Sequence, residues 1–242
     1  MRRGFVSYRV DRPDRSTIIG VTLSVNFADR LAHTLSHNSR LLDKIYVITD
    51  PSDSATIDIT SGFGGSLILS DVSRLKGAKF NKAGLIRAAQ QQLHAAYPKF
   101  WLIYFDADTR LPANLYETLG RVPVWRRDTI YEMPRRIYAT LEDMEQGVFQ
   151  RVGVNCGFFQ MYFDKSKLYQ SWSETAGECD IHFRNRFAGL YVLDGFCGHI
   201  GLDGQDWAGR MCFHPDQIAD GVKGGLEGQA AARVDLGLTE HR

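Results

Sequence analysis

The sequence predicts an α/β fold with a Rossmann-like, mostly parallel central sheet flanked by helices. Strand-like and helix-like segments alternate over the first hundred residues, which is typical of parallel strands joined by right-handed crossovers. One of these segments, Phe100–Phe105 (FWLIYF), is apolar throughout, as a central strand buried on both faces should be. The length of 242 residues suits one domain with a substantial core.

The first β-α units begin near the N-terminus. The range Thr17–Asn26 is rich in β-branched residues and predicts a buried strand, and Ala28–Leu42 follows with apolar residues at helical spacing. Asp43–Asp50 predicts a second strand, which Pro51 ends because proline has no backbone N–H to donate. Asp50 stands at the carboxyl end of its strand, as Asp106 does later in the chain, and ligands of parallel sheets gather at such ends.

A third strand and a long helix complete the first half. Three glycines form a turn before the predicted strand Ser66–Val72, but Leu67 stands where a dinucleotide-binding G-x-G-x-x-G pattern needs its last glycine. The range Asn81–Tyr97 has apolar residues on one helical face and is ended by Pro98, so we expect an amphipathic helix that leads into the apolar strand.

The second half is less regular. We expect strands at Thr129–Tyr138, Val152–Phe163 and Leu190–Gly195, with a polar, partly helical stretch at Ser166–Phe187. Residues 1–218 are predicted to form a single domain. Residues 219–242 are expected to be a mobile tail, because glycine, alanine and charged residues replace aromatic ones there.

Composition excludes some classes of protein. The net charge of +1 excludes a globally basic nucleic-acid binder, although the cluster Arg126, Arg127, Arg135 and Arg136 leaves a phosphate-bearing acceptor open. The 4 cysteines do not resemble a disulfide framework and favour a reducing compartment. The arginine-rich N-terminus predicts no signal peptide and the chain has no apolar run of membrane-spanning length, so we expect a cytoplasmic protein.

Two carboxylates carry the chemistry. In FWLIYFDADTRLP, Asp106 and Asp108 stand two residues apart where the apolar strand emerges. Charge in such a place needs compensation, and Mg²⁺ or Mn²⁺ provides it by taking one or two carboxylates together with phosphate oxygens and water. The same ion would neutralise the charge that develops on a nucleoside-diphosphate leaving group. A capping Asp followed by a turn Asp is the structural alternative.

This segment, a strand followed by D-x-D and then T-R-L-P, resembles the metal-binding segment of GT-A glycosyltransferases of the family-2-like, nucleotide-sugar-dependent type. The resemblance implies the GT-A fold and a metal-dependent transfer of a sugar from a nucleotide-diphosphate sugar to an acceptor hydroxyl. It implies that Asp108 ligates the metal and that Asp106 faces the metal or the ribose. The nucleotide-binding positions that it implies are Val25, Asn26, Asp50, Lys79, Asn81, Lys82 and Asp106.

Three further residues follow from the same resemblance. In inverting members an acid late in the chain deprotonates the acceptor, which makes Asp180 the candidate base and Glu178 its substitute; a helix cap explains Asp180 equally well. His199, in a glycine-rich loop, is the candidate third metal ligand, and an imidazole ligand favours Mn²⁺ over Mg²⁺. Retaining members need no base, so the stereochemical outcome is open.

The partners are only partly specified. A UDP-sugar is the favoured donor, and the acceptor is open between a glycan, a small molecule and a modified nucleobase in DNA. Three other functions remain as alternatives. The run DADT fits a haloacid-dehalogenase-like phosphatase, although such a motif normally follows the first strand. The second alternative is a structural zinc site formed by Cys197, His199, Cys212 and His214. The third is a domain that binds a nucleotide without catalysing a reaction.

Overall fold

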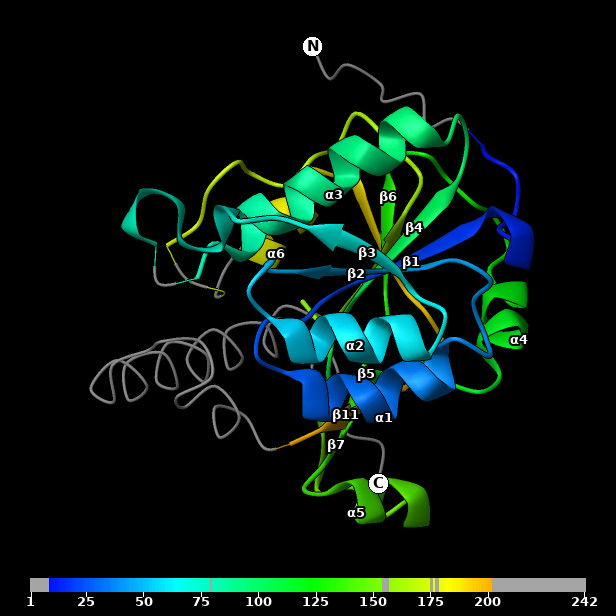
Figure 1. Ribbon diagram of the computed structural model, residues 1–242. Coiled ribbons are helices and arrows are strands. Elements are labelled where there is room, and N and C mark those ends of the chain that lie inside the picture. Colours follow the sequence, from blue (N-terminus) through cyan, green and yellow to red (C-terminus); the bar gives the residue numbers. More distant parts are fainter. Residues whose placement is uncertain (1–8, 79, 154–156, 175, 177–178, 202–242) are drawn as a thin grey trace.

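The computed structural model describes residues 9–78, 80–153, 157–174, 176 and 179–201. Its main sheet has seven strands in the order β10-β6-β9-β4-β1-β2-β3, and only β9 runs antiparallel to its neighbours β4 and β6. Helices cover both faces, with α1 and α2 on one side and α3 on the other (Figure 1). The predicted α/β class with a mostly parallel sheet is confirmed.

The bounds of the elements are as follows. The strands of the main sheet are β1 (Ile18–Leu23), β2 (Ile45–Thr49), β3 (Ser66–Leu69), β4 (Trp101–Asp106), β6 (Thr129–Glu132), β9 (Phe159–Tyr162) and β10 (Gly189–Val192). The helices are α1 (Ala28–Asn38), α2 (Ser54–Gly62), α3 (Lys82–Ala96), α4 (Leu115–Gly120), α5 (Leu141–Gln146) and α6 (Cys179–Arg184), with 3₁₀ turns η1 (Arg15–Thr17) and η2 (Val72–Gly77).

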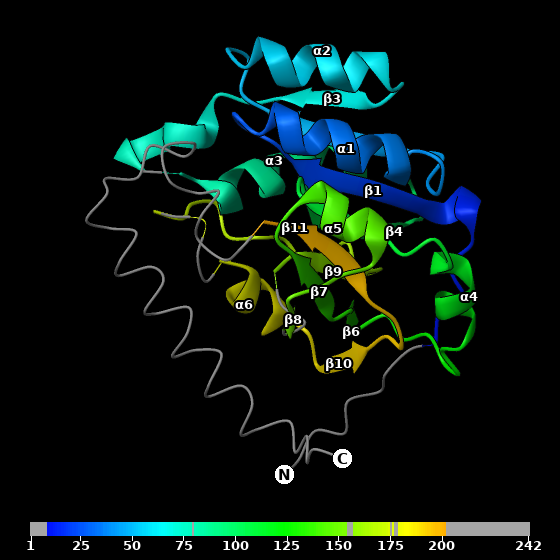
Figure 2. The same cartoon turned by 90° about the horizontal axis from the view of Figure 1, so that it is seen from below.

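A second, four-stranded sheet has the order β5-β11-β7-β8. Its strands are β5 (Thr109–Arg110), β7 (Arg135–Tyr138), β8 (Arg151–Gly153) and β11 (Cys197–Ile200). The short helix α5 covers one face of this sheet (Figure 2). Met144 of α5 packs there with Tyr138 and Ile200. Because β5 begins three residues after β4 ends, this sheet stands directly beside the D-x-D segment.

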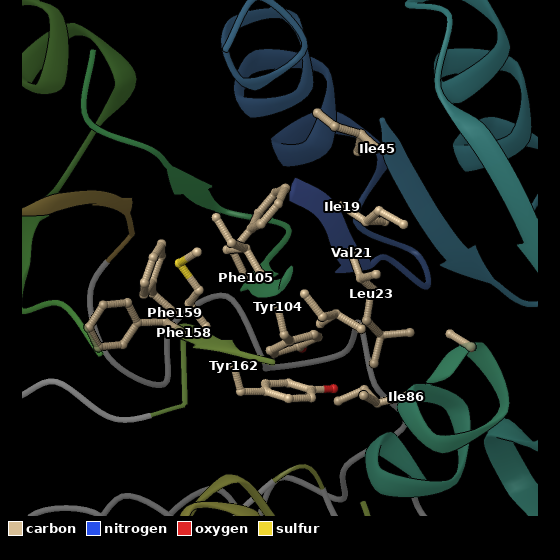
Figure 3. Close-up of a cluster of buried hydrophobic side chains, with 14 of the residues drawn as sticks. Ile19, Val21, Leu23, Ile45, Ile86, Tyr104, Phe105, Phe158, Phe159 and Tyr162 are labelled. Carbon is tan, nitrogen blue, oxygen red and sulfur yellow. The ribbon is translucent and has the colours of Figure 1, made fainter. Parts of the chain in front are cut away.

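The core is formed where β4, β1 and β9 meet the helices. Tyr104 and Phe105 of β4 pack with aromatic residues of β9 and the residue before it, Phe158, Phe159 and Tyr162 (Figure 3). All five are at most 1% exposed. This packing fixes the end of β4 and therefore the carboxylates that follow it. Within the described residues, no helix combines the length and hydropathy needed to span a membrane.

The second half differs from the predicted strands. The range Thr129–Tyr138 is split at Met133 and Pro134 into β6 and β7, which belong to different sheets. Pro134 cannot donate a ladder hydrogen bond, so the chain changes sheet there. The range Val152–Phe163 is likewise split into β8 and β9. In Ser166–Phe187 the described helix is confined to α6. The predicted tail, 219–242, lies outside the described residues.

Candidate functional site

The D-x-D segment lies at the carboxyl end of β4, and α1 holds it in place. Asp106 is the last residue of β4 and is in register with Leu23, the last residue of β1. Helix α1 then binds the backbone that follows: Thr34 Oγ1 donates to the Ala107 carbonyl at 2.5 Å and Asn38 Nδ2 donates to the Thr109 carbonyl at 2.9 Å. The backbone around Asp108 is thus fixed on both sides.

Asp108 and His199 are brought together by the second sheet. His199 in β11 is paired with Thr109 in β5, and its Nε2 lies 3.3 Å from Asp108 Oδ2. Both residues are buried, at 7% and 8% exposure. Burial raises the pKa of Asp108, and the nearby charges of His199 and Arg135 oppose that rise. Asp108 Oδ1 has no hydrogen-bond partner among the described residues, although it is buried.

The imidazole of His199 has a defined orientation. Its Nδ1 lies 3.2 Å from the Gly201 carbonyl, which can only accept a hydrogen bond, so Nδ1 carries the hydrogen. In the neutral ring, Nε2 then turns its lone pair toward the Asp108 carboxylate. Two lone pairs facing each other across 3.3 Å require a proton or a metal cation near them. The geometry of the pair therefore suits either a shared proton or a bound cation.

Asp106 takes part in a second, separate cluster. Lys82, the first residue of α3, is buried, and its Nζ lies 3.1 Å from Asp106 Oδ1 and 2.8 Å from Asp180 Oδ2. The Tyr104 hydroxyl donates to Asp106 Oδ1 at 2.9 Å. Burial acts to lower the pKa of Lys82, but the two carboxylates outweigh it and raise that pKa well above its ordinary value. Lys82 is therefore an internal counter-ion and not a surface lysine.

Asp180 lies in α6, and both of its carboxylate oxygens have partners. Besides Lys82, the Tyr169 hydroxyl lies 2.9 Å from Asp180 Oδ1 and 2.6 Å from Gln160 Oε1. Burial raises the pKa of Asp180, and Lys82 opposes that rise. The network continues through Gln160 Nε2, which donates to Glu132 Oε1 at 3.1 Å. A polar chain thus runs from Lys82 into the core between β6 and β9.

We expect this network to make stability depend on pH through Glu132. Burial raises the pKa of Glu132 from 4.5 to about 7. Between these values the folded protein keeps a proton that the unfolded chain releases, so the free energy of unfolding falls as pH rises through this range and levels off above it. The loss should be roughly 3 kcal/mol, at about 1.4 kcal/mol per pKa unit. Urea denaturation at several pH values should show this slope in the wild type and a flatter one in Glu132→Gln; equal slopes would contradict the expectation.

The predicted nucleoside-binding residues surround the ends of β1 and β2. Asn26, beside the partly buried Val25, has a left-handed φ of 60°, and its N–H donates to Asp53 Oδ2 at 2.7 Å. Asp50 holds its own turn by accepting from Ser52, and its Oδ2 accepts from Ser73 Oγ at 2.8 Å. Sequence reasoning missed Asp53, the N-cap of α2, although an Asp three residues before Thr56 was an available capping signal.

The remaining predicted residues are distributed differently. Asn81 is fully buried and caps α3: its Oδ1 accepts from Gly84 N at 3.0 Å and Ser173 N at 2.8 Å, and its Nδ2 donates to the Val72 carbonyl. We therefore infer a structural role for Asn81. Lys79 and Glu178 lie outside the described residues. So do Cys212 and His214 of the zinc alternative.

The predicted metal ligands do not gather into one large cluster. Within the part of the chain that the structure describes, no three His, Cys, Asp or Glu side chains come together as a candidate metal site. Asp108 and His199 form a pair, whereas Asp106 is turned toward Lys82. Two protein ligands are nevertheless enough for Mg²⁺ or Mn²⁺ when substrate phosphates and water complete the coordination.

No protein-family model matches the chain, and no curated protein matches it. Solved structures do. They include GalNAc-T7 with UDP, GalNAc and Mn²⁺ (16% identity, TM-score 0.48, 78% of this chain and 45% of that one). Two others are glucosyl-3-phosphoglycerate synthase from Mycobacterium tuberculosis (13%, 0.48, 81% and 76%) and mannosyl-3-phosphoglycerate synthase from Rubrobacter xylanophilus (18%, 0.47, 93% and 77%).

The chain is similar in fold to these glycosyltransferases. A nucleotidyltransferase, 4-diphosphocytidyl-2C-methyl-D-erythritol synthase, matches as well (16% identity, TM-score 0.44, 77% of this chain and 91% of that one). This chain spans less than half the length of the GalNAc-T7 chain. Identities this low concern the fold alone, so the activity has to be argued from the residues of the site.

Proposed function

We propose that the chain is a divalent-metal-dependent glycosyltransferase that uses a nucleotide-diphosphate sugar. The observation that carries the proposal is the Asp108–His199 pair. Its Asp108 Oδ2 lies 3.3 Å from His199 Nε2, and the other carboxylate oxygen, Oδ1, is buried without a hydrogen-bond partner among the described residues. A buried polar atom without a hydrogen-bond partner destabilises the folded protein unless a ligand binds to it. Its place at the carboxyl end of a central strand is where ligands of α/β sheets bind.

The donor atoms fit Mn²⁺ or Mg²⁺. A carboxylate oxygen suits either ion, and the Nε2 of His199 favours Mn²⁺. When bound, the ion would stabilise the negative charge of the departing nucleoside diphosphate. Asp108 and His199 would hold the ion, and the α1 side chains Thr34 and Asn38 would keep the Asp108 backbone from shifting as the diphosphate leaves.

The second cluster would act on the donor and acceptor. We propose that Asp106, whose side chain is 31% exposed and fixed by Lys82 and Tyr104, contacts the donor ribose or a metal-bound water. The acceptor hydroxyl would attack the anomeric carbon and lose its proton. The base role of Asp180 stays a prediction, because its 10% exposed side chain is held by Lys82 and Tyr169 and would need to release one of them.

A thermal-shift screen of nucleotide sugars with Mn²⁺ tests the proposal. We expect UDP-sugars to raise the melting temperature when Mn²⁺ is present and a chelator to remove the effect. A ligand at a hundred times its dissociation constant stabilises a protein by about 2.7 kcal/mol. Stabilisation by no nucleotide sugar, together with phosphate release from a simple phosphomonoester that Asp106→Asn abolishes, would favour the phosphatase alternative instead.

A further inference from the structure

Two neighbouring arginines of β7 point to opposite faces of the second sheet. Successive side chains of a strand alternate between faces, so Arg135 and Arg136 must diverge. Arg136 lies over the rings of Phe149 and Phe196, at 5.0 and 4.7 Å from their centroids, on the face that α5 covers. Arg135 lies over Phe158, 4.7 Å from its ring centroid, on the other face. The backbone carbonyl of Phe158 accepts a hydrogen bond from the Asp106 N–H, so the ring under Arg135 belongs to a residue that adjoins the D-x-D segment.

The face of Arg135 is also the face of His199. Cys197 is directly opposite Arg135 in the parallel β7–β11 pair, and His199 follows two residues later on the same side. Neighbouring strands lie about 4.8 Å apart and two residues advance about 6.6 Å along a strand, so the Cα atoms of Arg135 and His199 lie roughly 8 Å apart, within the reach of an arginine side chain. Arg135 also contributes to the electrostatic environment of Asp108.

Gly153 leaves space for the side chain of Arg135. Gly153 is paired with Arg135 across β7 and β8, and a Cβ placed on it would lie 2.8 Å from Arg135 Nε and 3.0 Å from Arg135 Cγ. The side chain of Arg135 therefore runs across the space above Gly153. Stacking on Phe158 uses the flat face of the guanidinium, whereas hydrogen bonds to an anion are made by its edge.

We propose that Arg135 binds a phosphate oxyanion of the substrate beside the Asp108–His199 pair. This inference rests on the proposed function and assigns a phosphate-binding residue that the sequence suggested only as part of a charged cluster. The resemblance implied nucleotide-binding roles for Lys79 and Lys82, but Lys82 pairs with Asp106 and Asp180. A guanidinium binds phosphate through two parallel hydrogen bonds, which gives Arg135 both charge and geometry for this role. The oxyanion belongs either to the donor diphosphate or to an anionic acceptor.

Calorimetric titrations of two probes test the assignment, after melting temperatures have shown that each variant is folded. UDP is titrated with Mn²⁺, and inorganic phosphate is titrated both into the protein alone and into the protein saturated with UDP and Mn²⁺. Arg135→Gln should weaken the binding of either UDP or phosphate by about tenfold or more, as expected for loss of charged hydrogen bonds. Arg136→Gln is the matched control, with the same chemical change on the opposite face, and should alter neither by more than about twofold.

Gly153→Ala adds a variant that keeps the charge. Its new methyl group should displace Arg135 and reproduce part of the loss seen in Arg135→Gln. Weaker UDP binding identifies the donor diphosphate as the source of the oxyanion, and weaker phosphate binding with normal UDP binding identifies an anionic acceptor. Wild-type levels of both in Arg135→Gln would overturn the inference. If the wild type binds phosphate but not UDP, the proposed function fails and the phosphate titrations still decide the role of Arg135; if it binds neither, both fail.

Discussion

Replacing Asp108 with asparagine is expected to abolish sugar transfer while leaving the protein folded. The substitution keeps the shape of the side chain but removes the charge that would hold the metal, and a metal of this kind contributes several kcal/mol to transition-state stabilisation. We therefore expect a fall in kcat/KM of about a thousandfold or more, measured with the donor found by the thermal-shift screen. Stability should not suffer, because Asp108 Oδ1 makes no hydrogen bond to a described residue and burial already raises the pKa of this carboxyl.

Asp164→Asn is the matched control for this prediction. Asp164 is as buried as Asp108, at 8% exposure, but its Oδ1 accepts from Ser166 and lies 3.4 Å from Arg127 Nη2. Asp164 follows the end of β9. Because β9 is antiparallel to β4, Asp164 lies near the start of β4, whereas Asp106 is at its end. Its substitution should cost stability and spare activity, the reverse of Asp108→Asn. Full activity in Asp108→Asn would remove Asp108 from the mechanism.

Lys82→Met should be among the most destabilising single changes in the chain. It removes the ammonium group that lies between Asp106 and Asp180 and leaves the buried carboxylate of Asp180 without its counter-ion. Breaking one partner out of a buried ion pair typically costs about 3–5 kcal/mol. Chemical denaturation should therefore show a large fall in the free energy of unfolding, and circular dichroism should establish whether the variant still folds.

Two further variants distinguish the effect of losing the buried ion pair from the effect of losing the lysine side chain itself. Asp180→Asn in the Lys82→Met background should recover part of the lost stability, because it removes the uncompensated carboxylate. Lys99→Met breaks a solvent-exposed pair with Asp11 and should change stability little. If Lys82→Met and Lys99→Met cost the same, the buried cluster does not contribute as we describe.

Local sequence patterns predicted the first half of the fold but not the second. β1, α1, β2, α3 and β4 follow from apolar periodicity and proline positions, each within a few residues of its observed bounds. Helix α2 has no apolar stripe and was missed, since its stability depends on the buried Asp53 cap and on packing against α1. The chain passes from one sheet to the other at Pro134, and this depends on tertiary packing, which the periodicity of a local sequence does not reveal.

In the candidate site too, local motifs predicted some residues and only tertiary contacts revealed the others. Asp106 and Asp108 could be singled out because their motif is local. The structure places His199 beside Asp108, and the role of these residues as metal ligands stays a prediction. Lys82 was expected to bind the nucleotide, whereas it pairs with two carboxylates, one of them 98 residues away in sequence. Tyr169 and Gln160 gave no signal, because their role depends on the burial of Asp180. The opposite orientations of Arg135 and Arg136 became clear only from the strand register.

The most direct test of the central claim is pulsed electron paramagnetic resonance of Mn²⁺ bound to the protein with UDP. Coordination by His199 should produce electron spin echo modulation from an imidazole nitrogen. We expect this ¹⁴N modulation in the wild type, its disappearance in His199→Gln, and a large loss of Mn²⁺ affinity in Asp108→Asn. Mn²⁺ and UDP bound equally well by all three proteins, without nitrogen modulation in any, would contradict the assignment of Asp108 and His199 as the metal ligands.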